Sequence, residues 1–464
     1  MNKAGSRLRS SKDVNMLEGP ILPAVVVFML PLVLSTLLQV LYSAADIVVL
    51  GRFASVSAQA SVGATSAINS LIVSWSVAIS VGSKIILARA LGAKDHKRAE
   101  RVVHTSVLFG LLLGLLFLVV GEALTYPLLH MTKCPAETIE GAALYLQITM
   151  LGCPATFSYN TLAALLRTKG DTKRPLYYLI FSGLLNVLLN LWFVAGLGMG
   201  VAGVAIATVA SNYLSAILVF VRLLRLPADD PCRVRFGRIR MNFAEVRRIV
   251  RLGLPTTISS LMYPISNLQI QSAINAFGDA AIAGNSAAGS VEGIISSVTG
   301  AISVAAVAFI GQNIGAGNRD RVKRIWKSML VFGVLLTLSI ELPMLFFGRQ
   351  ILSIYVDGPL AAAAIDFGYI RIVYNLLAYF VPAIMNLNSG TIQSFGYTTF
   401  SMFSSLIGVC GFRVLWMIAV YPHYKTPEVL YLCYPISWTL VAIVGTVFSV
   451  YLIRNFSRGK SYKL

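Results

Sequence analysis

Long apolar stretches separated by short polar segments make up most of the chain. Twelve of these stretches reach the roughly 20 residues that a helix needs to cross about 30 Å of hydrocarbon. We expect helices, because an open sheet edge in lipid would leave backbone groups without hydrogen-bond partners. The expected helices cover 21–50, 60–88, 103–125, 142–165, 175–197, 201–224, 249–277, 281–310, 325–347, 367–390, 398–421 and 429–453.

Three short patterns occur in both halves of the chain, about 224 residues apart. The near-constant offset indicates two copies of one six-helix unit. In a membrane protein such a duplication is typical of a transporter whose substrate path runs between the copies. The patterns are LeuProLeu at 30–32 and LeuProThr at 254–256, LeuGlyAlaLysAspHisLysArg at 91–98 and IleGlyAlaGlyAsnArgAspArg at 314–321, and LeuArgThrLysGlyAspThr at 166–172 and IleGlnSerPheGlyTyrThr at 392–398.

Composition and charge favour a membrane protein over a nucleic-acid-binding protein. Mean hydropathy is +0.75 and charged residues make up 12% of the chain, about half the usual share in soluble domains. Most of the 38 Lys and Arg residues behind the net charge of +19 lie in alternate connecting segments, which predicts that both termini are cytoplasmic. The two repeats then have the same orientation, and the basic segments meet anionic lipid headgroups. We therefore expect membrane lipids as partners and no nucleic acid.

The predicted organisation is an all-α polytopic membrane protein with two parallel repeats around a central cavity. Residues 17–224 are expected to form an N-lobe of six transmembrane helices, and residues 249–453 a C-lobe of six more. The remaining segments are a cytosolic tail at 1–16, a basic cytosolic linker at 225–248 and a basic cytosolic tail at 454–464. The protein is expected in the plasma (cytoplasmic) membrane as a monomer, because the two halves together suffice to close the cavity.

Residue patterns for nucleotide-driven or enzymatic chemistry are absent from the sequence. There is no Walker A phosphate-binding motif, and the five cysteines and four histidines lack metal-ligand spacing. No nucleophile, histidine or metal constellation lies among the expected spans. We expect a protein that is not an enzyme and has no cofactor, which leaves ion-coupled transport, passive flow or lipid scrambling.

Asp46 is the clearest ionisable residue inside an expected helix, and such residues usually have functional roles. A residue near the helix end that reaches the membrane interface is the structural alternative. A carboxylate there binds either a proton or a cation, and an antiporter requires this exclusivity. Asn186 and Asn190 share one helix face, and counting about 1.5 Å per residue puts them and Thr208 near the depth of Asp46. The four residues form the predicted cation-coupling site, with oxygen ligands for Na⁺ or a hydrogen-bonded carboxylate for H⁺. Interhelical hydrogen bonding is the structural alternative for the two asparagines.

Pro31 lies in the same expected helix as Asp46. A proline inside a membrane helix permits a kink. We expect Pro31 either to let the helix bend when Asp46 is protonated or to impose a fixed kink.

Further ionisable residues occur in the second half of the chain. Glu292 and Arg413 lie at compatible depths in two expected helices, and we expect them to form a polar pair in the C-lobe. A buried ion pair is weak evidence for function, so a structural lock is an equal alternative. Glu122 and Glu341 lie near the outer ends of their helices and are expected at the membrane interface.

Several short stretches lie in a particular order and spacing within the expected twelve-helix double repeat. They are ProLeuValLeuSer 31–35 with Asp46 and Gly51, LeuGlyAlaLysAsp 91–95, LeuArgThrLysGlyAspThrLysArgPro 166–175, AsnValLeuLeuAsnLeuTrpPhe 186–193, GlyValAlaIleAlaThrValAlaSer 203–211 and GlyGlnAsnIleGlyAlaGly 311–317. Through these stretches the chain, from about residue 17 to 453, resembles the multidrug and toxic compound extrusion family.

The resemblance implies export of organic cations and other drugs by alternating access, driven by inward Na⁺ or H⁺. It also implies that Asp46, Asn186 and Thr208 fall on positions of the family's N-lobe ion site. Asn190 stands where many prokaryotic members carry a second Asp, which removes a negative charge and favours H⁺ over Na⁺. The acidic pair that some members place in the seventh and tenth helices is missing here, so coupling is expected in the N-lobe.

A lipid-linked precursor flippase of related architecture is the alternative function. Its cavity should be strongly basic in order to hold pyrophosphate. The charges embedded in this chain are one Asp, one Glu and one Arg, which fits amphiphilic or cationic small-molecule substrates better.

Overall fold

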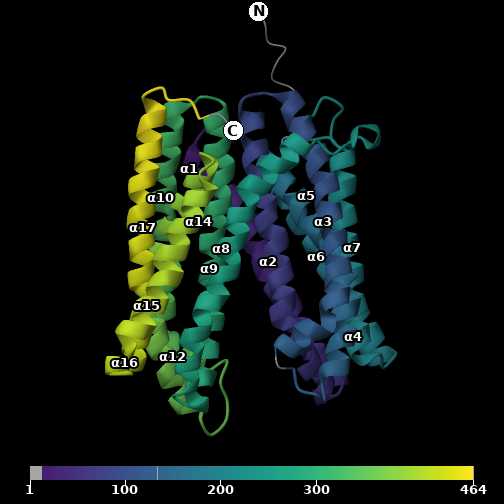
Figure 1. The fold of residues 1–464 in the computed structure, drawn as a ribbon, viewed down its shortest axis with the longest axis vertical. Coiled ribbons are helices and arrows are strands. Elements are labelled where there is room, and N and C mark those ends of the chain that lie inside the picture. The colour runs from purple at the N-terminus through teal and green to yellow at the C-terminus, as the bar shows by residue number, and fades with distance from the viewer. Residues whose placement is uncertain (1–12, 133, 463–464) are drawn as a thin grey trace, which may run out of the picture. The chain divides into compact units, whose positions relative to one another are not determined.

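The computed structural model describes residues 13–132 and 134–462, which form α-helices joined by short connections (Figure 1). No β-strand occurs in this part of the chain, and the predicted all-α fold class is confirmed. Residues 1–12 of the predicted N-terminal tail lie outside the described residues, as do Lys133 and positions 463–464 of the predicted C-terminal tail.

Helices cover each of the predicted membrane segments. A π-helical segment follows α6 at Leu191–Gly196, another precedes α15 at Leu406–Gly411, and a short 3₁₀ turn covers Phe236–Arg238. The α-helices are α1 Ile21–Phe53, α2 Val56–Gly92, α3 His96–Met131, α4 Ile139–Met150, α5 Cys153–Lys169, α6 Lys173–Asn190, α7 Gly200–Leu224, α8 Phe243–Asn275, α9 Asp279–Gly315, α10 Arg319–Phe346, α11 Gly348–Leu352, α12 Ala361–Leu376, α13 Phe380–Ser394, α14 Thr398–Ser405, α15 Phe412–Ala419, α16 Tyr421–Tyr424 and α17 Pro427–Ser457.

Irregular stretches occur in the same helices of both repeats. The fourth predicted helix, 142–165, is interrupted between α4 and α5, and its counterpart, 367–390, is bent by 49° between α12 and α13. The fifth helix of each repeat contains one of the two π-helical segments. Within the described residues, nine helices are long and apolar enough to cross a membrane, or ten with the bent pair. The other two predicted spans, 142–165 and 249–277, are helical but fall outside those limits of length and composition.

The repeated sequence patterns correspond to repeated turn geometry. Gly170 ends α5 with a φ of 116°, and Gly396 follows α13 with a φ of 87°. Glycine adopts this left-handed conformation without the steric cost of a Cβ. Lys94 after α2 and Gly317 after α9 are also left-handed, with φ values of 56° and 72°. The patterns that reveal the duplication therefore mark turns that both halves need.

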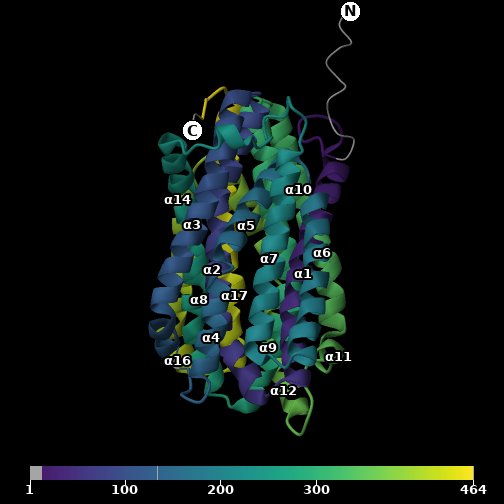
Figure 2. The same ribbon diagram turned by 90° about the vertical axis from the view of Figure 1, so that its right-hand side faces the viewer.

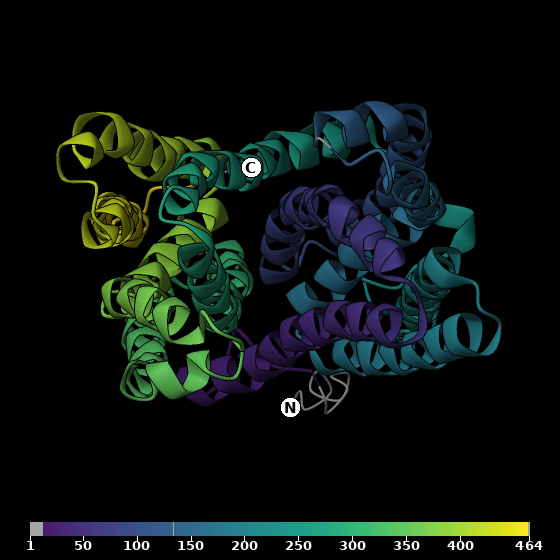
Figure 3. The same cartoon turned by 90° about the horizontal axis from the view of Figure 1, so that it is seen from below.

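Contacts divide the described chain into two units, within each of which the long helices run alongside one another (Figures 2 and 3). Unit 1 contains residues 13–15 and Leu30–Gly253, and unit 2 contains Met16–Met29 and residues 254–462. These boundaries differ from the predicted lobes, because the first part of α1 packs with unit 2 and the first part of α8 packs with unit 1. In both helices the chain changes unit just before a proline of the repeat, Pro31 or Pro255.

Arg321 at the start of α10 holds the segment that leads into α1. Its guanidinium donates to three backbone carbonyl oxygens, those of Met16 at 3.3 Å, Glu18 at 3.0 Å and Gly19 at 3.0 Å. The amide of Asn313 at the end of α9 also donates to the Met16 carbonyl, at 3.0 Å. Hydrogen bonds to its backbone thus hold the beginning of the segment Met16–Met29 in unit 2.

Arg98 occupies the corresponding place in the first copy of the repeated pattern, at the start of α3. Its Nε lies 3.7 Å from a carboxylate oxygen of Glu245 at the start of α8. Nearby, the backbone N–H of Asn242 donates to the hydroxyl of Thr105 at 3.3 Å. Equivalent arginines therefore contact the first helix of the opposite repeat at its start, or the segment just before it.

Small residues allow α9 and α12 to approach closely in unit 2. A Cβ added at Gly284 would lie 2.0 Å from the carbonyl oxygen of Ala364 and 2.8 Å from the backbone nitrogen of Gly368. A Cβ at Gly368 would lie 2.6 Å from the Gly284 carbonyl oxygen. Small residues at such positions are a common basis of helix packing in membranes.

We expect Gly284→Ala to destabilise the protein by about 1–3 kcal/mol, because overpacking would force α9 and α12 apart. Gly293→Ala in the same helix is the matched control, since nothing lies within 4 Å of a Cβ at that position. Thermal unfolding of the purified variants in detergent measures the difference. An equal effect of the two substitutions would show that the α9–α12 contact does not limit stability.

Candidate functional site

A close contact between α1 and α6 positions the predicted coupling residues. The Tyr42 hydroxyl on α1 donates to the carbonyl oxygen of Leu179 on α6 at 2.9 Å. The Tyr42 ring covers Gly183, where an added Cβ would lie 1.8 Å from the ring. Asp46 lies about one turn after Tyr42, and Asn186 about one turn after Gly183, so the same contact sets the depth of both polar residues.

The four predicted coupling residues, Asp46, Asn186, Asn190 and Thr208, lie together in the structure. Asn190 Nδ2 donates to Asp46 Oδ1 at 2.5 Å, and the Thr208 hydroxyl donates to Asp46 Oδ2 at 3.4 Å. Asn190 Nδ2 also lies 3.2 Å from Asn186 Oδ1, while Asn186 Nδ2 donates to the Thr208 hydroxyl at 3.4 Å. Each carboxylate oxygen of Asp46 thus has one neutral donor, supplied by α6 or α7.

The cluster contains one carboxylate and a buried acceptor without a partner. Asn186 and Asn190 are buried, and Oδ1 of Asn190 has no hydrogen-bond partner among the described residues. An unsatisfied buried oxygen is costly, and either a hydroxyl proton or a cation would satisfy it. In the described part of the chain, no group of three or more His, Cys, Asp or Glu side chains is placed to hold a metal ion. The oxygens present suit a proton, or one monovalent cation with Asp46 as its only charged ligand.

Apolar side chains pack next to the cluster. Val49 and Leu50 of α1 lie with Val194 and Val204 in one buried hydrophobic group of unit 1. These apolar side chains give the polar groups low-dielectric surroundings, where electrostatic interactions and hydrogen bonds have larger energies than in water. A change in the charge of Asp46 would therefore change the energies of its hydrogen bonds strongly.

Pro31 lies inside α1, four turns before Asp46, and α1 remains helical through it. The Ser35 hydroxyl donates to the Pro31 carbonyl oxygen at 2.7 Å. The chain changes from unit 2 to unit 1 between Met29 and Leu30. This position makes Pro31 a candidate bending point, and its role stays a prediction.

Glu292 forms an ion pair with Arg371, a residue to which the sequence reasoning assigned no role. Arg371 Nη2 and Nε lie 2.6 Å and 3.0 Å from the two carboxylate oxygens, which is a bidentate arrangement. Asn375 Nδ2 donates to the same carboxylate at 2.8 Å, and Arg371 Nη1 donates to Asn285 Oδ1 at 2.6 Å. These residues bind α9 to α12 in the interior of unit 2.

The predicted pairing of Glu292 with Arg413 is therefore wrong. Arg413 Nη1 donates to Asn267 Oδ1 at 2.9 Å, its Nε donates to the Ser437 hydroxyl at 3.3 Å, and its guanidinium carbon lies 4.1 Å from the centre of the Tyr434 ring. Depth along the membrane normal matched Glu292 with Arg413, but it says nothing about the direction in which a helix face points.

A more accurate start of the predicted helix 367–390 would have identified Arg371 as a residue inside the membrane. The predicted helix 367–390 placed it four residues from an end, where a long basic side chain can reach the interface. The structure begins α12 at Ala361, so Arg371 lies well inside the helix. Glu341 was also expected at the interface but is only 1% exposed, whereas Glu122 is partly exposed.

Comparisons with known proteins match this architecture. The sequence model of the MatE family matches residues 31–192 and 255–417, once in each half of the chain. The chain belongs to the MatE family. Members of this family are transporters and not enzymes. The two matched regions begin at Pro31 and Pro255, the same two prolines that mark the repeat.

Two bacterial relatives align with most of this MatE chain. One is the probable multidrug resistance protein YoeA of Bacillus subtilis, 28% identical over 433 residues that cover 90% of this chain and 91% of the relative. Another is the probable multidrug resistance protein NorM of Thermotoga maritima, 24% identical over 385 residues that cover 82% and 81%.

Solved structures show the same fold. A MATE protein in complex with MaL6 superposes with a TM-score of 0.89 at 20% identity, over 97% of this chain and all of that one. An outward-facing multidrug resistance MATE transporter of the MOP superfamily superposes with a TM-score of 0.87 at 21% identity, with the same coverage. This likeness concerns the fold, and it agrees with the predicted twelve helices in two repeated lobes.

We expect Glu292→Gln to destabilise unit 2 by about 3–5 kcal/mol, because it would leave the Arg371 charge buried without a counter-ion. Replacing both residues by leucine should restore most of the stability, since neither charge then remains. Thermal unfolding in detergent of the single and double variants measures this coupling. A double variant that is as unstable as the single one would show that the ion pair itself is not the source of the effect.

Proposed function

We propose that this protein is a multidrug exporter that exchanges amphiphilic or cationic small molecules for protons bound at Asp46. The observation that carries the proposal is the single carboxylate among the neutral side chains of Asn186, Asn190 and Thr208. One proton on Asp46 removes the only formal charge of this cluster, which lowers the cost of burying it in a membrane. Na⁺ is the alternative ligand, but a single negative charge attracts it less strongly than a pair of carboxylates would.

Protonation would rearrange the hydrogen bonds of the cluster. The ionised Asp46 accepts from Asn190 and Thr208, whereas a protonated carboxyl group carries one O–H donor. The new O–H needs an acceptor, and Oδ1 of Asn190, which has no hydrogen-bond partner among the described residues, would supply one after rotation of its side chain. The two protonation states thus favour different hydrogen bonds between α1 and the helices α6 and α7.

Such a difference is the requirement for coupling. An ion shifts a conformational equilibrium only if it binds the two conformations with different affinity. We propose that external protons bind at Asp46, that α1 responds by bending or shifting near Pro31, and that the drug is released on the outer side. Return of the proton to the cytoplasm would complete an alternating-access cycle.

The expected substrates follow from charge and from the names of the relatives. Both relatives described above are named as probable multidrug resistance proteins. In unit 2 the Arg371 charge is balanced by Glu292, whereas the side-chain partners of Arg413 are neutral. One such arginine falls short of the strongly basic cavity that a pyrophosphate group requires. We therefore favour amphiphilic or cationic substrates over those of a lipid-linked precursor flippase.

The proposal includes location and assembly. The basic ends of the helices are proposed to face the cytoplasm across the plasma membrane, with lipids as neighbours. A monomer is proposed to suffice, and no resident cofactor is needed for exchange of a proton against a drug.

We expect Asp46→Asn to abolish proton-driven drug export in liposomes while the protein still folds. Asparagine has nearly the same shape as aspartate but cannot take up or release a proton near neutral pH. Uptake or release of a fluorescent organic cation under an imposed pH gradient, and separately under a Na⁺ gradient, measures the coupling.

Glu122→Gln is the matched control, because it changes a carboxylate of unit 1 that is only partly buried and lies outside the cluster. It should leave pH-driven export unchanged. Normal export by Asp46→Asn would refute coupling at this site. If the unmodified protein moves the dye under neither gradient but flips a labelled pyrophosphate lipid, the flippase function would replace the proposal.

We expect Asn190→Asp to change the ion preference toward Na⁺. Because Asn190 contacts Asp46 directly, a second carboxylate there would strengthen attraction for Na⁺ on the order of tenfold or more. Na⁺-dependent thermal stabilisation and export under a Na⁺ gradient measure the change. A variant whose affinity for Na⁺ stays the same would argue against these oxygens as the ion ligands.

A further inference from the structure

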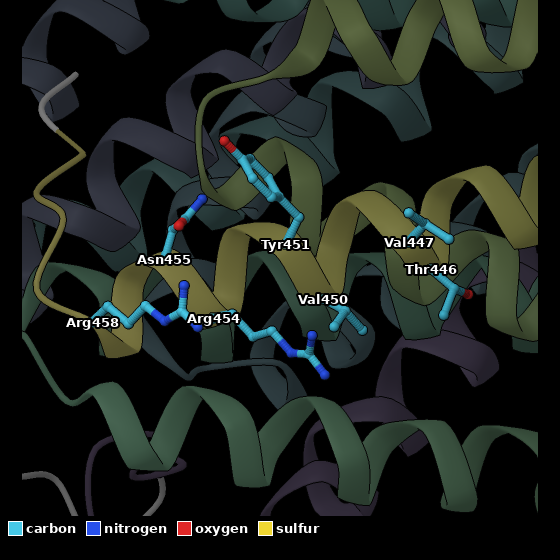
Figure 4. A pocket seen from close by; sticks show the side chains of 7 residues that line it. All are labelled: Thr446, Val447, Val450, Tyr451, Arg454, Asn455 and Arg458. Atoms are coloured by element: carbon cyan, nitrogen blue, oxygen red, sulfur yellow. The ribbon is translucent and has the colours of Figure 1, made fainter.

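A cavity of about 450 Å³ lies along the C-terminal part of α17 in unit 2. Figure 4 shows its side chains following one another along the helix, from Thr446 and Val447 at one end to Arg454 and Arg458 at the other. At about 1.5 Å per residue the lining extends for roughly 18 Å. It is lined by Thr446, Val447, Val450, Tyr451, Arg454, Asn455 and Arg458.

The polar end of the cavity carries two positive charges. Arg454 and Arg458 are spaced i, i+4 on α17, so they lie on the same face of the helix. Both are exposed, and neither forms an ion pair or side-chain hydrogen bond with another described residue. Basic pockets at the membrane interface are typical binding sites for anionic lipid headgroups.

Asn455 supplies a hydrogen-bond donor at the same end. Its side chain is 8% exposed, and it forms a hydrogen bond with the Tyr462 side chain. The amide nitrogen of asparagine carries two N–H donors. One of them therefore remains for a phosphate oxygen in the cavity.

The other end of the cavity is apolar and open to the surroundings of α17. Val447 is 66% exposed and Tyr451 is 54% exposed. The Tyr451 ring stacks near Phe448, with ring centres 6.0 Å apart, and Phe448 stacks on Phe400 at 3.9 Å. Aromatic residues of this kind are enriched where a membrane helix meets the headgroup region.

We propose that this cavity binds an anionic glycerophospholipid. The phosphate would lie between Arg454, Arg458 and the amide of Asn455, and an acyl chain would run along Val450 and Val447. The change from charged to apolar lining within one helix face matches the change from headgroup to hydrocarbon in a single lipid leaflet. Two arginines exclude a cationic substrate of the exporter, and a free phosphate ion would leave the apolar part of the cavity unused. The proposal does not depend on coupling at Asp46.

Lipid titration of the purified full-length protein tests this site. Native mass spectrometry counts bound dioleoyl phosphatidylglycerol and bound dioleoyl phosphatidylcholine, which share the same acyl chains. We expect tighter binding of the anionic lipid, and we expect R454Q/R458Q to weaken that binding about 30-fold. Asn455→Leu should weaken it about tenfold, through loss of one hydrogen bond to a charged group.

Three comparisons complete the design. R247Q/R251Q removes an exposed i, i+4 arginine pair from α8 and should leave phosphatidylglycerol binding unchanged. R454K/R458K keeps both charges and should retain most of the binding. Inorganic phosphate at the same concentration as the lipid should not displace it, because it lacks the apolar contacts.

The outcomes separate the explanations. Equal loss in R454Q/R458Q and R247Q/R251Q would show general attraction to basic surface and overturn the proposal. Equal affinity for the two lipids, or full displacement by inorganic phosphate, would also overturn it. Unchanged melting temperatures and elution volumes of the variants establish that each loss concerns binding and not folding.

Discussion

A polar group inside hydrocarbon must find its partner within the protein, and this constraint organises both units. The two buried clusters satisfy it in different ways. In unit 1 the carboxylate of Asp46 has only neutral donors from Asn190 and Thr208. In unit 2 the carboxylate of Glu292 has a guanidinium partner in Arg371. The charge of Glu292 is balanced by an arginine, whereas the charge of Asp46 has no cationic side chain among its hydrogen-bond partners. The first pair joins two helices, and the second carboxylate is the proposed ion site.

Close backbone contacts bring these clusters into place. Helices in lipid gain little from burying apolar surface, so packing and interhelical hydrogen bonds decide how they associate. Gly183 lets Tyr42 approach α6 just beside the Asp46 cluster, and Gly284 lets α12 approach α9 two turns before Glu292. The polar contacts can be short because the neighbouring glycines leave no side chain between the backbones.

The first part of α1 belongs to unit 2 and the first part of α8 belongs to unit 1, so each of these helices has residues in both units. Of two equivalent arginines, Arg98 contacts the start of α8 and Arg321 contacts the segment that leads into α1. Each exchanged helix then enters its own unit at a proline of the repeat, Pro31 or Pro255. The helix that carries Asp46 thus has residues in both units.

Features that run along the chain could be read from the sequence. Apolar length located the twelve helices, the recurring patterns located the duplication, and residue counting placed Asp46, Asn186, Asn190 and Thr208 at one depth. Features that depend on neighbours could not. The partner of Glu292, the exchange of helix ends between the units and the surroundings of Asn455 are set by the tertiary structure. The physical reason is that hydropathy and spacing specify the position of a residue along a helix axis. The rotation of that helix, and the helix it faces, result from packing among residues far apart in the chain.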